Sequence, residues 1–255
     1  MTPLDKFGEV YLKREDKNIT GSAKDRAIPL QVENLIKLGF TKAAISSSGN
    51  AAISAGYYCS QNHIHLTAFL SPKTSKSKLK LISANFIAIT DTPISDAFKF
   101  SKNNAYFLRQ STDSIAMIGY QSIATELLVQ CPQISSIFIP VGSGTTLLGI
   151  SKILPSSVKI FAVQPASHCP IASHFDNNFI PESQTKTDAL SVKFLPLKNE
   201  VISACYSGIV VQDDDISNEI NASAEANLAF AGYQKAKITH DVGNFPVILV
   251  TGAKR

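Results

Sequence analysis

Short apolar runs alternate along this chain with longer stretches in which apolar residues recur every three or four positions. Such runs suit strands buried on both faces, and the longer period suits amphipathic helices. The alternation predicts an α/β fold in which mostly parallel sheets are flanked by helices. The expected strands are residues 10–13, 43–46, 64–70, 86–90, 105–108, 137–140, 159–163, 208–211 and 246–250.

Helices are expected between these strands, over residues 24–38, 50–61, 73–83, 94–101, 116–129, 145–154 and 213–235. The stretch 166–200 is expected to be rich in loops, because Pro, Ser, Asn and His accumulate there without a clear period. We expect two lobes. Residues 1–42 and 102–255 would form the larger lobe, and residues 43–101 would form a smaller lobe inserted into it.

The composition and charge of the chain exclude several classes of protein. The chain has 255 residues, of which 44% are hydrophobic and 17% charged, which is typical of a globular protein and excludes a disordered chain or a coiled coil. The net charge of +4 comes without the dense basic stripe that nucleic-acid binding requires. No long apolar stretch predicts a membrane span, and the N-terminus lacks the pattern of a secretory signal, so we expect a cytoplasmic protein.

Cysteine and histidine positions give no indication of a metal site. The four cysteines lie far apart and form no CxxC pair, so we expect free, buried thiols. His168, Cys169 and His174 lie close in sequence but have no carboxylate beside them to complete a ligand set. We therefore expect no bound metal.

The first segment that could carry chemistry is VYLKREDKNITGSAKDR, residues 10–26, in which Lys24 is expected to open a helix. The partial positive charge of a helix N-terminus disfavours a second positive charge and favours a neutral amine. A neutral amine can form an imine with a carbonyl group. The alternative is an ordinary solvated lysine.

The second segment, SSSGNAAISAGYY over residues 46–58, is a strand end followed by a glycine turn and a helix. Backbone N–H groups and hydroxyls of such a turn can bind the carboxylate of an amino acid. The alternative is an ordinary helix N-cap, which Ser and Asn also favour. The candidate residues are Ser47, Ser48, Gly49, Asn50 and Ala51.

Two further segments follow predicted strands. In PVGSGTTLLGI, residues 140–150, five consecutive small residues would let the backbone wrap closely around a phosphate. The pattern is neither the GK[ST] of a P-loop nor a clean GxGxxG. These five are Gly142, Ser143, Gly144, Thr145 and Thr146. In VILVTGAKR, Thr251 follows a buried strand and lies where ligands of α/β sheets gather.

In this order and spacing, the four segments resemble fold-type II enzymes that use pyridoxal 5'-phosphate (PLP): threonine synthases, threonine and serine dehydratases, cysteine synthases and the tryptophan synthase β chain. The resemblance extends from Thr2, Pro3 and Leu4 to Thr251 and Gly252. It implies that Lys24 binds PLP as a Schiff base and that Asn50 contacts the ring oxygen of the cofactor. It further implies that residues 142–146 bind the 5'-phosphate, that Thr251 meets the pyridine nitrogen, and that residues 47–51 bind substrate in the smaller lobe.

The resemblance also implies a reaction. Lys24, once released from the cofactor, would remove the Cα proton of a small amino acid, and a neutral Thr251 would favour elimination or replacement over transamination. The form of residues 46–58 and the presence of Thr251 favour a threonine-synthase-like activity, with a threonine or serine dehydratase as the alternative. Ala116 and Gln121 stand where we expect basic residues, which leaves open a catalytically inactive PLP-binding protein. A homodimer is possible by the same resemblance.

Overall fold

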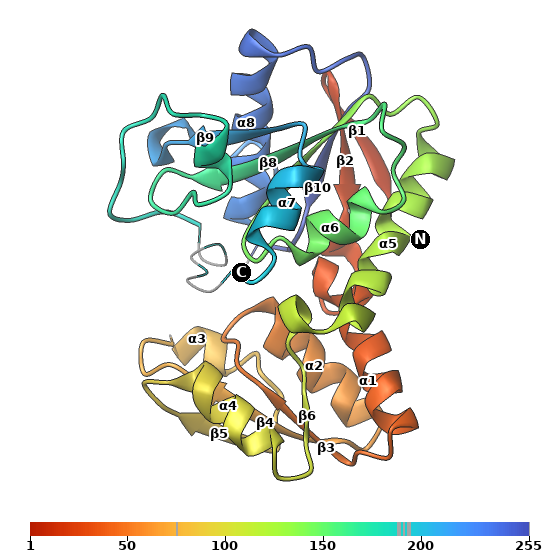
Figure 1. The fold of residues 1–255 in the computed structure, drawn as a ribbon, viewed down its shortest axis with the longest axis vertical. Helices are drawn as coiled ribbons and strands as arrows, with labels where there is room; N and C mark the ends of the chain where they lie inside the picture. Colours follow the sequence, from red (N-terminus) through yellow and green to blue (C-terminus); the bar gives the residue numbers. More distant parts are fainter. Residues whose placement is uncertain (75, 188–189, 191, 193–194, 255) are drawn as a thin grey trace. The chain divides into compact units, whose positions relative to one another are not determined.

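The computed structural model describes residues 1–74, 76–187, 190, 192 and 195–254, which form two compact units (Figure 1). Unit 1 comprises Met1–Ala23 and the chain from Tyr120 onward, and unit 2 comprises Lys24–Gly119. Residues 24–42 and 102–119, which we expected in the larger lobe, lie in unit 2. None of the helices in the described ranges combines the length and the apolar character needed to cross a membrane.

Unit 1 is built on a six-stranded sheet whose strands, apart from the edge strand β1, are buried along most of their length. Its order is β1 (Leu4–Phe7), β2 (Val10–Arg14), β10 (Pro246–Val250), β7 (Ser136–Pro140), β8 (Lys159–Pro165) and β9 (Ser207–Val211). Only the pairing of β1 with β2 is antiparallel among these described strands. Parallel strands need long connections that cover the sheet faces, which explains why these strands are continuous apolar runs.

Four helices belong wholly or partly to unit 1 within the described residues: α5 (Ser114–Gln130), α6 (Thr145–Ser151), α7 (Lys198–Ala204) and α8 (Ala224–Thr239). Figure 1 shows α6 and α7 in front of the strands and α8 behind them. The rings of Phe138 and Phe161, on adjacent strands, stack with centroids 4.5 Å apart, and Tyr233 of α8 meets Phe138 edge-on at 5.5 Å. Such aromatic packing fixes α8 against the middle of the sheet.

Unit 2 contains a four-stranded parallel sheet in the order β5 (Phe86–Ile89), β4 (His65–Leu70), β3 (Lys42–Ile45) and β6 (Tyr106–Phe107). Alternate residues of β3 face opposite sides. Ala43 and Ile45 pack with α1 (Ile28–Lys37) and α2 (Asn50–Gln61), whereas Ala44 packs with α4 (Pro93–Ser101). Because α1 and β6 complete this core, residues 24–42 and 102–119 belong to the same unit as the smaller sheet. A short helix, α3, spans Lys76–Leu79.

The predicted α/β class with mostly parallel sheets is confirmed, and each of the nine predicted strands is present. Two elements were missed, namely β1 at the sheet edge and α7, which begins inside the stretch that we expected to be loops. The helix predicted over residues 213–235 is present as α8, but its predicted start is wrong, because α8 begins only at Ala224. Asp213–Asp215 instead form a separate 3-10 turn, in which the Asp213 carboxylate accepts hydrogen bonds from Thr185 Oγ1 at 2.8 Å and Lys186 N at 2.6 Å.

A lysine with no exposed surface lies in the core of unit 1. Lys13 Nζ is 2.5 Å from the Glu126 carboxylate, 3.0 Å from the Thr2 carbonyl oxygen and 2.9 Å from the Gln130 side-chain oxygen. Burying an ammonium group is costly unless a countercharge and further acceptors surround it. These contacts tie the N-terminus and β2 to α5, so the arrangement depends on every partner being present.

Replacing Glu126 by alanine should therefore destabilise the protein by about 3 kcal/mol, because the Lys13 charge would stay buried without its countercharge. Urea unfolding followed by circular dichroism would measure the loss. Asp241→Ala is the matched control, since Asp241 also pairs with a lysine, Lys159, at 2.7 Å but is 80% exposed. Equal shifts of the unfolding midpoint in the two variants would contradict the importance of the buried pair.

Candidate active site

Three adjacent parallel strands of unit 1 end at the same edge of the sheet. Val250 of β10 is in register with Arg14 of β2, and Ile248 of β10 is in register with Phe138 of β7. Because all three strands run in the same direction, the segments that follow them emerge side by side. These segments are the turn leading toward Lys24, the stretch that begins at Thr251, and the glycine-rich turn after β7.

Main-chain hydrogen bonds join the first two of these segments. Ser22 and Gly252 form an antiparallel bridge. Ala23 N donates to the Thr251 carbonyl oxygen at 3.0 Å, and Ala253 N donates to the Gly21 carbonyl oxygen at 2.9 Å. Thr251 is thereby held beside the residue that directly precedes Lys24, although the two come from opposite ends of the sequence.

The turn before this bridge is fixed by Asn18. Its amide Nδ2 donates to the Glu15 carboxylate at 2.7 Å and to the Ser22 carbonyl oxygen at 3.2 Å. Gly21, with φ of +78°, closes the turn by donating its N–H to the Asn18 carbonyl oxygen at 2.9 Å. A side chain that bonds backbone groups in this way defines a tight turn, so the approach to Lys24 has one conformation.

Lys24 lies in a short 3-10 turn, Ala23–Arg26, and the expectation that it opens an α-helix is wrong. α1 begins at Ile28, with Pro29 in its first turn. A helix extended back to Lys24 would bring the Pro29 ring against the carbonyl group of Asp25, four residues earlier. The field of a helix acts within its first turn, so the sequence-based argument for a neutral amine from the helix dipole does not apply here.

The glycine-rich turn connects β7 to α6, as predicted. Gly144 has φ of +84°, and a Cβ added to it would lie 2.3 Å from Cγ2 of Val201, so neither the conformation nor the space admits a side chain. Ser143 Oγ and Thr145 Oγ1 are 3.1 Å apart. Gly142, Ser143 and Thr146 are partly exposed, which leaves backbone N–H groups and hydroxyls available to an anion.

The predicted carboxylate loop lies in unit 2, between β3 and α2. Gly49 N donates to Ser47 Oγ at 3.2 Å, and Ser47, Ser48, Gly49 and Asn50 are all partly exposed. A Cβ added to Gly49 would have no neighbouring atom within 4 Å, so the loop borders open space. The side chain of Ala51, by contrast, is buried in the core of unit 2.

A contact that the sequence did not predict joins the Lys24 turn to the helix of this loop. Ser54 Oγ, in the second turn of α2, donates to the Asp25 carboxylate at 2.7 Å, and both side chains are buried. Burial, together with the negative charge of Asp25, raises the pKa of nearby Tyr58 to about 12. Asp25 follows Lys24 directly, and this adjacency was the one sequence signal that could have identified it.

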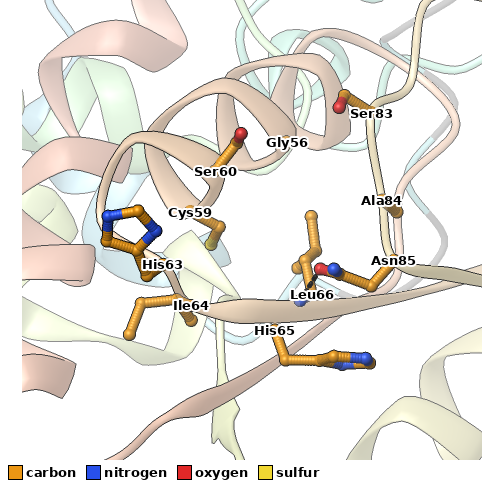
Figure 2. A pocket seen from close by; sticks show the side chains of 10 residues that line it. All are labelled: Gly56, Cys59, Ser60, His63, Ile64, His65, Leu66, Ser83, Ala84 and Asn85. Atoms are coloured by element: carbon orange, nitrogen blue, oxygen red, sulfur yellow. Dashed lines mark hydrogen bonds between the residues drawn. The ribbon is translucent and has the colours of Figure 1, made fainter.

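Unit 2 contains a cavity of about 440 Å³, and none of the predicted site residues lines it. Figure 2 shows the residues that do. The cavity is lined by the end of α2 and by residues that precede or begin β4 and β5, among them His63, His65 and Asn85. These are the amino-terminal ends of the strands, whereas the predicted loop follows the carboxyl end of β3. The rings of His63 and His65 point away from one another (Figure 2). Within the described residues, no three His, Cys, Asp or Glu side chains form a group suited to a metal ion.

Comparisons with known proteins identify the family. Residues 1–233 match the family model "Pyridoxal-phosphate dependent enzyme". A cysteine synthase of Staphylococcus aureus is 27% identical over 266 residues, which cover 91% of this chain and 82% of the relative. A threonine synthase of Methanocaldococcus jannaschii is 24% identical over 210 residues, covering 72% of this chain and 51% of the relative.

The fold has relatives among solved structures. Maize serine racemase superposes with a TM-score of 0.85 at 20% identity, over 100% of this chain and 88% of the racemase chain. Together with the family match, this confirms the expected fold-type II architecture and PLP as the cofactor of the family. The chain belongs to the family of pyridoxal-phosphate dependent enzymes.

Proposed function

We propose that Lys24 binds PLP covalently and that the enzyme eliminates or replaces a leaving group on the side chain of a small amino acid. The observation that carries this proposal is the main-chain bridge between residues 21–23 and 251–253. It holds the backbone of Thr251 beside Ala23, which directly precedes Lys24, so the residues that would supply a neutral hydroxyl and an amine come from the two ends of the sequence. An aldehyde cofactor with a ring nitrogen requires both groups at one site.

The residues around this edge fit the cofactor. Gly144 and its small neighbours form a turn without bulky side chains, and their N–H groups and hydroxyls suit a phosphate dianion. Thr251 would meet the pyridine nitrogen. In unit 2, Asn50 would contact the ring oxygen, and the open space beside Gly49 suits the carboxylate of a substrate bound by residues 47–51.

When bound, PLP supplies a ring that withdraws electrons from the substrate Cα. Lys24 has two tasks in the proposed reaction, since its amine anchors the cofactor and, once displaced by the substrate, takes the proton from Cα. The Thr251 hydroxyl carries no charge, so it does not hold the pyridine nitrogen protonated as a carboxylate would. This choice of partner favours elimination and replacement over transamination. The hydrogen bond from Ser54 to Asp25 restricts the turn on which Lys24 lies.

A threonine-synthase-like reaction is our leading proposal, supported by Thr251 and by the SSGNAAISAGYY form of the carboxylate loop. One observation favours a second candidate, whose substrate carries no phosphate group. Ala116 is fully buried and Gln121 is neutral, so these positions offer no cation to the phosphate of O-phosphohomoserine. A dehydratase acting on threonine or serine, or a replacement enzyme acting on O-acetylserine, needs no such cation.

Product analysis of the purified holoenzyme separates these candidates. O-Phosphohomoserine would give threonine, threonine or serine would give a 2-oxo acid, and O-acetylserine with sulfide would give cysteine. We expect one of these products, measured by chromatography against authentic standards. A protein that binds PLP but turns over none of these substrates would contradict the enzymatic proposal and indicate a catalytically inactive PLP-binding protein.

Lys24→Ala should abolish irreversible capture of PLP, because no other amine is proposed to bond the aldehyde. The native protein is reduced with borohydride, digested, and mapped by mass spectrometry for a phosphopyridoxyl group on Lys24. The neighbouring exposed lysine Lys17 provides the matched control, and Lys17→Ala should retain the full adduct. A stoichiometric adduct in the Lys24→Ala protein would contradict the assignment.

Gly144→Ala should weaken PLP binding at least tenfold and lower stability, because a Cβ there overlaps Val201 and distorts the proposed phosphate turn. Gly39→Ala is the matched control: Gly39 also has a positive φ, +80°, but a Cβ would meet no atom within 4 Å. Backbone strain alone, about 1–2 kcal/mol, is expected in the control. Fluorescence titration with PLP would measure the affinity, and urea unfolding would measure the stability. Unchanged PLP affinity in Gly144→Ala would exclude this turn as the phosphate site.

A further inference from the structure

A glutamine with no exposed surface lies on β8, between β7 and β9 of unit 1. Gln164 Nε2 donates to the Val141 carbonyl oxygen at 3.0 Å. Gln164 Oε1 accepts hydrogen bonds from Ile171 N and Ala172 N, both at 2.9 Å. Val141 directly precedes Gly142, the first residue of the proposed phosphate turn. Three hydrogen bonds of one side chain therefore join the start of this turn to the segment that follows β8.

The bond to Val141 replaces one that the main chain cannot make. Between parallel strands, the N–H and C=O groups of one residue bond to two residues of the neighbouring strand that lie two positions apart. Val141 N donates to the Val163 carbonyl oxygen at 2.9 Å, so the Val141 carbonyl oxygen would accept from the N–H group of residue 165. Residue 165 is a proline, which has no N–H group. Val141 is almost fully buried, and the Gln164 amide supplies the donor that Pro165 cannot.

The other end of the Gln164 side chain is fixed by a segment that packs on β9. Ile171 and Ala172 are fully buried. A Cβ added to Gly208 of β9 would lie 2.6 Å from the Ala172 Cα atom, so this segment packs directly on the β9 backbone. Because a buried acceptor cannot leave two N–H donors without a cost, Gln164 Oε1 is held in one position. The donor at Nε2 is thereby held as well.

The Val141 carbonyl group and the Gly142 N–H group belong to the same planar peptide unit. In a trans peptide the two groups point in opposite directions. The bond that directs the Val141 carbonyl oxygen toward Gln164 therefore also sets the direction of the Gly142 N–H group. A turn that binds a phosphate through its backbone depends on such N–H groups being oriented before the ligand arrives.

We propose that Gln164 is a positioning residue of the phosphate site, which orients the Gly142 N–H group through the Val141 carbonyl group. This inference rests on the proposed function, since it takes residues 142–146 to bind the cofactor phosphate. Gln164 acts through the peptide unit and takes no part in proton transfer at the substrate Cα. The affinity for the phosphate then depends on the segment 171–172, which holds the Gln164 side chain from behind.

Gln164→Met tests the proposal by comparing PLP with pyridoxal, which lacks the phosphate group. Methionine is close to glutamine in volume but offers no N–H donor. The native protein should bind PLP more tightly than pyridoxal, and the substitution should reduce this preference about tenfold, which corresponds to one hydrogen bond. Fluorescence titration with each compound measures the preference. Affinity for pyridoxal should stay unchanged, whereas a general loss of structure would weaken the binding of both compounds.

Gln31→Met is the matched control. Gln31, in unit 2, is equally buried, and its side chain donates to the Asp113 carboxylate at 2.6 Å and accepts from Gln110 Nε2 at 3.1 Å. Its loss should lower the urea unfolding midpoint, as Gln164→Met does, without changing the preference for PLP over pyridoxal. A preference that survives Gln164→Met, or that falls equally in Gln31→Met, would overturn the inference.

Pro165→Ala gives an independent test, because it restores the main-chain N–H group that the sheet directs at the Val141 carbonyl oxygen. Combined with Gln164→Met, it should return the preference for PLP to within about threefold of the native value, since one donor replaces another. The double variant also gives a reading if Gln164→Met alone does not fold. A folded double variant whose preference stays about tenfold below the native value would oppose the inference. A native protein that binds PLP no more tightly than pyridoxal would instead refute the phosphate turn, and with it the proposed function.

Discussion

The main-chain bridge between residues 21–23 and 251–253 is the constraint on which the rest of the proposed site depends. It is made entirely of backbone groups, so it does not depend on the identity of most side chains around it. Its geometry follows from the parallel pairing of β2 with β10, which brings the ends of both strands to one edge. Ala23 and Thr251 gain their proximity from this pairing and not from their side chains.

Three polar side chains fix backbone segments near the proposed site through named partners. Asn18 holds the turn before Lys24, Asn227 holds the entry to α8, and Ser54 holds the turn that contains Asp25. Segments held in this way stay rigid, which lowers the entropic cost of binding a ligand.

Two glycines lie in the turns whose backbone N–H groups would bind the cofactor phosphate and the substrate carboxylate in the proposed site. Gly144 cannot be replaced without both strain and overlap with Val201, whereas Gly49 faces open space. The two glycines therefore differ in their roles. Gly144 lets its turn pack against Val201, whereas Gly49 leaves open space beside its loop. In the proposed site, the phosphate and the ring of PLP would be held by different segments of the chain.

The sequence by itself determined the α/β class, the nine strands it predicted, and the family. Buried strands and small-residue turns are local patterns, so they can be recognised from residues that are close together in the sequence. It placed the start of the last helix at residue 213 and not at Ala224, since α8 is buried on nearly every side and its apolar period does not mark where it begins. Only the tertiary structure could assign α1 to unit 2 and pair Ser54 with Asp25. These features depend on which distant segments meet, and that is decided by strand order and burial, which no local pattern encodes.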